Sequence, residues 1–409
     1  MAVTKLTIAY CRSYQAAFRV AVKFLDWTEP QVIKGEGALR KLPEIVKNNG
    51  HYSVLVVTDK GLMGLNLLDP LFEGLKEQGI NFVVYDGVQP NPTIANIEEA
   101  VKIYNNHRCS AIIAFGGGSP MDCAKICGAR IARPNTPVKK MRGTLKVLKK
   151  LPMLYAVPTT AGTGSETTLA AVVSDPSTHE KYAVQDPVLR PKYAVLDPTL
   201  TVGLPKHITS TTGMDALTHA VEAYIGQSNT PETEEAAKKA VRLIFDNIKT
   251  AYDDGKNIEA RENMLEASYL AGCAFTRAYV GYVHAIGHNL GGMYGTPHGL
   301  AMAVILPYVL EFFGETAHAR LAELADVAGL ETAGLAEHQK AELFIETIKE
   351  MNKYMGIPEH LEIQPNDVPT LAQRALHEAN PLYPVPKIMG FPDCVELIGK
   401  IGDLGENWK

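Results

Sequence analysis

The chain has 409 residues, of which 46% are hydrophobic and 21% are charged, so a wholly disordered protein is excluded and two or three domains are expected. The formal net charge of -5 gives no reason to expect nucleic acid or a membrane as a partner. The six cysteines form no CxxC pair, which argues against a disulfide framework and against a thiolate zinc site. Because the N-terminal residues lack the apolar core of a secretory signal, we expect a cytoplasmic protein.

Short apolar runs alternate with helical patterns in the first half of the chain. Each run is continuously apolar, which is typical of strands that are covered on both faces. The runs cover residues 54–57, 82–85, 111–115 and 154–157, and helices are predicted over residues 94–105 and 120–132. Strands and helices in alternation predict a parallel α/β sheet.

The strand pattern disappears after residue 205. Long helical patterns then cover residues 213–225, 231–252 and 258–275. We therefore predict an α/β domain over residues 1–204 and an all-helical domain over residues 205–409. Within the first domain, residues 1–30 form an extension to which the sequence assigns no role.

Two turns rich in small residues follow two of the predicted strands. The first reads GGGSPMD over residues 116–122, and the second reads PTTAGTGSE over residues 158–166. Glycines let a backbone approach a ligand closely, and the N-terminus of the following helix suits a phosphate group. A tight turn without a ligand is the alternative for either turn alone, but two such turns at the carboxyl ends of strands favour a nucleotide site. The chain has no P-loop, which argues against phosphoryl transfer by that machinery.

Asp59 stands at the end of the strand predicted around residues 54–57. A carboxylate at that position accepts hydrogen bonds from a ribose 2′-hydroxyl and repels a 2′-phosphate, so it would favour NAD over NADP. An ordinary helix N-cap is an equally good interpretation of this aspartate taken alone.

Acidic and imidazole side chains recur at helical spacing in the second half of the chain. Asp215 and His219 are four residues apart, as are His284 and His288, and His298 follows ten residues later. One carboxylate with several imidazoles indicates a site for Fe²⁺, Zn²⁺ or a similar divalent ion. Five candidates exceed the four ligands of a compact site, so we expect one of them to be a proton carrier instead.

These motifs resemble the iron-containing (group III) alcohol dehydrogenase family. The resemblance covers roughly residues 30–400 and rests on GGGSPMDCAK, PTTAGTGSE, GMDALTHAVEA and HAIGHNLGGMYGTPHG, in this order. It implies an N-terminal α/β dinucleotide-binding domain and an all-helical C-terminal metal-binding domain, as in the dehydroquinate synthase-like architecture. The sequence departs from the family pattern at Ala170, where some members carry an asparagine that contacts the nucleotide, and over residues 380–391.

The resemblance also assigns roles to single residues. The metal ligands would be Asp215, His219, His284 and His298, the catalytic residue near the nicotinamide would be His288, and Phe275 would line the substrate pocket. The cofactor-binding residues would be Asp59, Asn91, Gly117, Gly118, Ser119, Asp122, Thr159, Thr160, Thr163 and Lys181.

We therefore predict an NAD-dependent iron-containing alcohol dehydrogenase that acts on a primary or small alcohol, a diol, or the corresponding aldehyde or hydroxy-carbonyl compound. The expected cofactors are Fe²⁺, with Zn²⁺ as the alternative metal, and NAD(H) in preference to NADP(H). The expected assembly is a homodimer or a higher homo-oligomer without nucleic acid or membrane. The alternatives are zinc-dependent polyol oxidation of the glycerol dehydrogenase kind, a dehydroquinate synthase-like lyase, a metallohydrolase, and a binding protein without catalysis.

Overall fold

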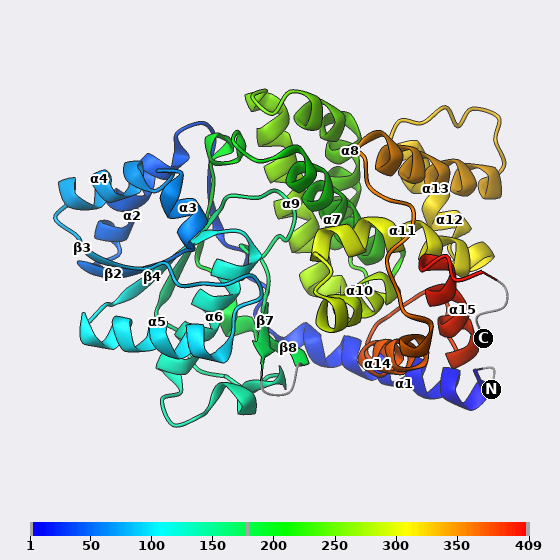
Figure 1. The fold of residues 1–409 in the computed structure, drawn as a ribbon, viewed down its shortest axis with the longest axis horizontal. Coiled ribbons are helices and arrows are strands. Elements are labelled where there is room, and N and C mark those ends of the chain that lie inside the picture. The colour runs from blue at the N-terminus through cyan, green and yellow to red at the C-terminus, as the bar shows by residue number, and fades with distance from the viewer. Residues whose placement is uncertain (1–2, 177–179, 406–409) are drawn as a thin grey trace. The chain divides into compact units, whose positions relative to one another are not determined.

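The computed structural model describes residues 3–176 and 180–405 and divides the chain into two compact units (Figure 1). The α/β unit comprises Asp26–Leu204 and Lys256–Gly272. The helical unit comprises Met1–Leu25, Pro205–Gly255 and Cys273–Lys409. The N-terminal extension up to Leu25 therefore groups with the helices of the second half of the chain, rather than with the α/β segment that follows it.

A six-stranded, all-parallel sheet forms the centre of the α/β unit, which confirms the predicted fold class. In spatial order its strands are β1 (Gln31–Lys34), β9 (Tyr193–Leu196), β6 (Met153–Pro158), β4 (Ala111–Gly116), β2 (Ser53–Val57) and β3 (Asn81–Tyr85). The four apolar runs of the sequence are β2, β3, β4 and β6. β1 was not predicted because it is largely exposed. β9 reads YAVL, an apolar run as long as the shortest predicted ones, and the sequence reasoning missed it.

Side chains of the sheet alternate between two cores, as the pleat of a strand requires. Leu55 and Ile112 pack on one face with helices α5 (Ile94–Asn106) and α6 (Gly118–Ala132). Val54 and Ile113 pack on the other face with α2 (Leu42–Asn48) and α4 (Asp69–Glu77). Figure 1 shows these helix pairs on opposite sides of the sheet. Burial on both faces explains why the strands read as continuous apolar runs.

Smaller elements complete the α/β unit. A three-stranded sheet in the order β5-β8-β7 contains an antiparallel β7–β8 pair, which the sequence did not predict. These elements are β5 (Gly143–Thr144), β7 (Ala170–Asp175), β8 (Glu180–Gln185), the short helix α3 (Lys60–Gly64) and the 3-10 turns η2 (Ala38–Lys41), η3 (Val138–Met141), η4 (Pro187–Leu189) and η5 (Pro198–Thr201).

Helices alone build the described part of the helical unit, as the sequence predicts. Thr230 caps helix α8 (Pro231–Asp253), because its side-chain oxygen accepts a hydrogen bond from the backbone N–H of Thr233. The helices are α1 (Lys5–Ala21), α7 (Lys206–Ile225), α8 (Pro231–Asp253), α10 (Tyr282–Tyr294), α11 (His298–Phe313), α12 (His318–Val327), α13 (Glu337–Tyr354), α14 (Val368–Ala379) and α15 (Phe391–Ile401), with the 3-10 turns η1 (Val22–Phe24), η6 (Gly314–Thr316) and η7 (Pro365–Asp367). Helix α9 (Ile258–Ala278) contributes residues to both units.

Helix α11 is the central helix of this unit. It packs against α7, α10, α13 and α15, and most of its residues from Ala301 onward are buried. By length and composition alone, the described stretch His298–Thr316 is apolar enough to cross a membrane, but 56% of it is buried inside the protein. A core helix satisfies the same criterion, and its neighbours show that α11 has this position.

Candidate metal centre and nucleotide-binding turns

Helix α7 presents three functional side chains on one face. Asp215, His219 and Glu222 follow one another at spacings of four and three residues, which aligns them along the helix. All three side chains are buried. Helices α8 and α11 pack against α7, so its second half is surrounded by protein. The same packing that holds α7 in place therefore removes these polar groups from water.

Helices α10 and α11 supply the other imidazoles. His284 and His288 lie one turn apart on α10, and His298 is the first residue of α11. The start of α11 lies directly against α7, because a Cβ atom at Gly299 would stand only 2.5 Å from the carbonyl oxygen of Thr211. Glycine at this position thus permits the approach that brings His298 Nε2 to 3.4 Å from Asp215 Oδ1.

The four side chains expected to bind a metal converge in the helical unit. Asp215, His219, His284 and His298 each offer one nitrogen or oxygen atom, and these atoms all lie within 4.8 Å of one another. Asp215 Oδ1 and His284 Nε2 are buried and have no hydrogen-bond partner among the described residues. Buried polar atoms are normally satisfied, so two such atoms in a cluster of donor groups indicate a place for a cation.

The cluster is most exposed on the side of His298 and His288, which is called its open side below. The side chains of Asp215, His219 and His284 are at most 5% exposed, whereas that of His298 is 39% exposed and that of His288 is 31% exposed. The side of His298 and His288 is therefore the side from which a small molecule would reach the cluster.

Glu222 fixes the orientation of one imidazole. Its Oε2 atom lies 2.6 Å from His284 Nδ1, and its Oε1 atom accepts a hydrogen bond of 2.8 Å from the backbone N–H of Val283. With Nδ1–H donating to the carboxylate, the lone pair of His284 Nε2 is directed toward the cluster. The sequence reasoning did not identify this residue, although its spacing from His219 places it on the same helix face.

The electrostatics of the cluster favour a bound cation. Burial raises the pKa of Asp215 to about 8 and lowers the pKa of His284 well below its usual value. Both shifts come from loss of hydration of the charged form. A divalent cation stabilises the carboxylate and uses neutral imidazoles as ligands. One carboxylate with three imidazoles is a donor set that suits iron or zinc, so these residues fit the metal that the sequence predicts.

His288 and Phe275 lie beside this cluster. The ring of His288 stacks on that of His298, with centroids 5.4 Å apart, and His288 Nδ1 is 2.7 Å from Glu378 Oε1. Phe275 stacks on His219, with centroids 4.0 Å apart. The structure therefore brings both residues next to the expected ligands, and it adds Glu378, which the sequence reasoning missed.

The two glycine-rich turns of the α/β unit lie side by side. A Cβ atom at Gly117 would stand 3.3 Å from Thr160 Oγ1, and one at Gly118 would stand 3.1 Å from Thr163 Cγ2. The backbone N–H of Thr159 donates to the carbonyl of Gly116 across the neighbouring strands β4 and β6. The N-terminus of α6, where Gly117 supplies no side-chain cap, thus faces the second turn. Such a surface of small residues and free N–H groups suits a pyrophosphate.

Three further expected nucleotide residues form a chain of hydrogen bonds. Ser119 Oγ accepts from the backbone N–H of Asn91 at 3.1 Å, and Lys181 Nζ donates to Asn91 Oδ1 at 2.9 Å. Burial lowers the pKa of Lys181. Asn91, Ser119 and Lys181 are distant in sequence, so the fold itself assembles this edge beside the first glycine turn.

The two aspartates expected to bind the nucleotide also have structural roles. Asp59 Oδ1 accepts from the backbone N–H of Leu62, so Asp59 is the N-cap of α3. Asp122 accepts from the Ser165 hydroxyl and from the backbone N–H of Val172. Asp122 thereby ties helix α6 to the segment that follows the second turn.

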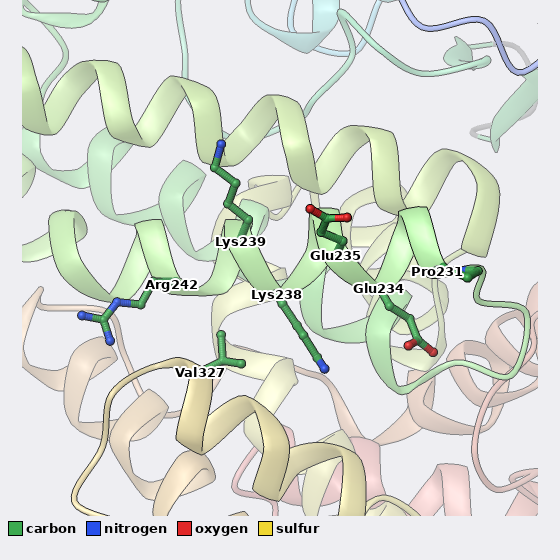
Figure 2. A pocket seen from close by; sticks show the side chains of 7 residues that line it. All are labelled: Pro231, Glu234, Glu235, Lys238, Lys239, Arg242 and Val327. Carbon is green, nitrogen blue, oxygen red and sulfur yellow. The ribbon is translucent and has the colours of Figure 1, made fainter.

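A separate pocket lies on the surface of helix α8, with Val327 at the end of α12 beside it (Figure 2). Its lysine and arginine side chains already have partners, because Lys238 pairs with Glu323 at 3.2 Å and Arg242 pairs with Asp246 at 2.7 Å. None of the expected site residues lines this pocket. We therefore place the candidate site at the histidine cluster instead.

Comparisons with known proteins agree with the geometry. A family model described as "Iron-containing alcohol dehydrogenase" matches residues 29–198, and the model of the "Fe-containing alcohol dehydrogenase family, C-terminal" matches residues 209–401. The chain is 39% identical over 367 residues to the 1,3-propanediol dehydrogenase of Citrobacter freundii, with 88% of this chain and 95% of that protein covered. It is 35% identical over 352 residues to the NAD-dependent methanol dehydrogenase of Bacillus methanolicus, with 85% and 92% covered.

The fold comparison gives the same result. The solved structure of a 1,3-propanediol oxidoreductase aligns with a TM-score of 0.89 and 36% sequence identity, covering 92% of this chain and 100% of that chain. The resemblance inferred from the motifs is therefore confirmed at the level of the family and of the fold.

Proposed function

We propose that this chain, which belongs to the iron-containing alcohol dehydrogenase family, transfers a hydride between NAD(H) and a small primary alcohol or short diol and its aldehyde. The observation that carries the proposal is the convergence of Asp215, His219, His284 and His298 in a largely buried cluster that is exposed at His298. The paired glycine-rich turns of the α/β unit support the nucleotide as second substrate.

The substrate class is supported by the names of the relatives. They include a 1,3-propanediol dehydrogenase, a methanol dehydrogenase and a lactaldehyde reductase of Escherichia coli, which is 33% identical. Each name refers to a compound of one to three carbons that carries a hydroxyl or an aldehyde. These relatives do not favour glycerol dehydrogenase-like chemistry or a metallohydrolase. Phe275, stacked beside His219, would give the pocket an apolar wall that suits a short carbon chain.

The site residues have separate roles in the proposed reaction. The four expected ligands would hold iron, which supplies Lewis acidity toward the hydroxyl or carbonyl oxygen when bound. Glu222 keeps His284 Nε2 directed at the cluster through the hydrogen bond to Nδ1. His288, half-exposed at the open side, would carry the hydroxyl proton toward solvent. The glycine turns and Lys181 would hold the pyrophosphate and ribose of the nucleotide.

The preferred nucleotide and the preferred metal are also part of this proposal. The carboxylate of Asp59 has one oxygen engaged as the N-cap of α3, and its negative charge would disfavour a 2′-phosphate, so we infer a preference for NAD(H) over NADP(H). Iron is inferred over zinc because of the family, since one carboxylate and three imidazoles accept either metal.

A rate screen tests the proposed function. Purified protein loaded with Fe²⁺ or Zn²⁺ is assayed with methanol, ethanol, 1,3-propanediol, 1,2-propanediol and their aldehydes, each with NAD(H) and NADP(H). The expected result is oxidation of short primary alcohols or diols with NAD. Binding of NADH without turnover of any compound on this panel would contradict the proposed function.

A further inference from the structure

Glu378 of helix α14 receives two hydrogen bonds on a single oxygen. His288 Nδ1 lies 2.7 Å from Glu378 Oε1, and the hydroxyl of Tyr383 donates to the same oxygen at 3.1 Å. Asn289 Nδ2 donates to the second oxygen, Oε2, at 3.4 Å. Burial, and after it the Glu378 charge, raises the pKa of Tyr383 well above its usual value, so the phenol stays neutral and remains a donor. These hydrogen bonds give the Glu378 carboxylate one preferred orientation, and the carboxylate in turn orients the ring of His288.

Tyr383 belongs to a loop that helix α1 holds from the other side. Gln15 Nε2 donates to the carbonyl oxygens of Pro381 and Tyr383, at 3.0 and 2.8 Å. Arg12 donates through its two terminal nitrogens to the carbonyls of Val385 and Pro386, each at 2.8 Å. Four carbonyl oxygens of the loop 381–386 thus accept hydrogen bonds from two side chains of α1.

The packing of α1 fixes the side chains that make these contacts. Gln15 is 3% exposed, which is unusual for an amide side chain unless its hydrogen bonds are satisfied. Arg12 Nη1 also donates to Gln15 Oε1 at 2.9 Å, so Arg12 keeps the amide in the orientation that directs Nε2 at the loop. Cys11 is buried on the same side of the helix, and Phe18 packs on Tyr279. The residues of α1 that face the loop are therefore fixed by apolar packing as well.

Helix α1 lies outside both family models, which match residues 29–198 and 209–401. Its contacts converge on the part of the chain, residues 380–391, where the sequence departs from the family pattern. Helix α1 binds the loop that carries Tyr383, and the Tyr383 hydroxyl contacts Glu378. These contacts indicate that the helix and the loop share a role at Glu378.

We propose that Glu378 is the positioning residue for His288, and that helix α1 maintains this position through Gln15 and the loop that carries Tyr383. The proposal rests on the role of His288 in the proposed function. The order of contacts is Gln15 to the backbone of Tyr383, the Tyr383 hydroxyl to Glu378, and Glu378 to His288 Nδ1. Loss of any contact frees the imidazole to rotate away from the open side of the cluster, and a misplacement of about 1 Å can slow a reaction roughly a hundredfold.

The first test compares two replacements of Glu378. Glu378→Gln keeps an acceptor oxygen for His288 and Tyr383, so kcat should stay within about threefold of the wild type. Glu378→Ala removes the acceptor, and kcat should fall about tenfold to a hundredfold, the range of a misplaced proton carrier. The KM for NAD and the metal content should be unchanged in both. Equal kcat in wild type and Glu378→Ala would overturn the positioning role.

The second test asks whether α1 acts through His288. Gln15→Ala should lower kcat severalfold in the wild-type background and have no further effect in His288→Ala, because coupled residues are not additive. A purely structural role for Gln15 would lower activity in both backgrounds by the same factor. Arg19→Ala, on the exposed side of the same helix, is the matched control and should match the wild type.

Amide hydrogen exchange gives a readout that does not depend on turnover. The backbone N–H of Tyr383 donates to the carbonyl of Ala379 at the end of α14, that of Val385 donates to Tyr383, and that of Gln227 donates to Pro384. Gln15→Ala should accelerate exchange at these three amides, whereas Arg19→Ala should not. Unchanged exchange in Gln15→Ala would overturn the role of α1. If the wild-type protein oxidises no alcohol, the proposed function fails, and the exchange comparison still decides whether α1 holds the loop.

Discussion

The nucleotide turns and the histidine cluster are built in different ways. In the α/β unit, the two turns meet through backbone and small side chains, with Gly117 against Thr160 and Gly118 against Thr163. In the helical unit, charged and imidazole side chains from three helices meet in a buried cluster. The first region would offer backbone N–H groups to its ligand. The second region has buried polar atoms, Asp215 Oδ1 among them, that lack hydrogen-bond partners.

The two regions should therefore respond differently to substitution. A buried carboxylate oxygen without a hydrogen-bond partner is costly, so the cation and its ligands depend on one another, and removal of one ligand should affect metal content and catalysis together. A turn made of backbone groups should lose affinity gradually when its shape changes. The two regions can therefore be separated by measuring metal content and nucleotide affinity on the same variants.

The largest effect is expected at Asp215. Asp215→Asn keeps the shape of the side chain but removes the only carboxylate among the expected ligands, so metal content should fall below about a tenth of an equivalent and activity roughly a thousandfold. Metal analysis and initial rates measure both, and NADH binding should be unchanged. Asp246→Asn, on the surface of α8, is the control. Retained metal with full activity in Asp215→Asn would remove Asp215 from the ligand set.

The next largest effect is expected at Glu222, which orients His284 and is not one of the expected metal ligands. Glu222→Gln preserves an acceptor for His284 Nδ1 but not the charge, whereas Glu222→Ala removes the partner altogether. Replacement of such an outer carboxylate typically weakens metal affinity about tenfold to a hundredfold. Competition with a chelator should therefore rank the wild type first, Glu222→Gln second and Glu222→Ala last. The same affinity in all three proteins would show that His284 needs no orienting partner.

A smaller effect is expected from Gly118→Ala in the first turn. The added Cβ atom would stand 3.1 Å from Thr163 Cγ2, closer than ordinary contact, so the two turns must separate slightly. Such a shift would move the N–H groups of the first turn away from the position that suits a pyrophosphate, so the affinity for NADH should fall about severalfold. Fluorescence titration with NADH should show that loss while metal content stays at the wild-type value. A variant that lost metal instead would contradict the separation of the two regions.

The smallest effect is expected at Asp59. Asp59→Asn keeps an oxygen that can cap α3 and removes the negative charge that would repel a 2′-phosphate. The ratio of kcat/KM for NADP to that for NAD should rise severalfold. Asp59→Ala also removes the cap and should in addition lower the free energy of unfolding by about 1 kcal/mol. An unchanged nucleotide ratio in Asp59→Asn would make Asp59 a helix cap alone.

The sequence predicted what local patterns determine. The continuous apolar runs identified β2, β3, β4 and β6, because strands buried on both faces need apolar residues at every position. The antiparallel β7–β8 pair and the edge strand β1 were missed, since their residues include polar and exposed positions that do not differ from loops. The five spaced Asp and His residues identified the cluster, because helical spacing shows which side chains share a face.

The hydrogen-bond partners of those residues could be identified only from the structure. Glu222 and His284 are 62 residues apart, and His288 and Glu378 are 90 residues apart, so no local pattern connects them. The first 25 residues had no motif at all, and only the hydrogen bonds of Arg12 and Gln15 to the loop 381–386 reveal what α1 does. Spacing along a helix predicts a ligand set, whereas the second layer of contacts depends on tertiary packing.

The dependence of activity on metal content tests whether the histidine cluster is a catalytic metal centre. The protein is stripped with a chelator, reloaded with Fe²⁺ or Zn²⁺, and assayed with a short primary alcohol and NAD, beside a His298→Ala variant treated in the same way. We predict that the stripped protein is inactive, that about one equivalent of metal per chain restores turnover, and that His298→Ala neither retains the metal nor recovers. Full turnover by the metal-free protein, or by His298→Ala, would contradict the account.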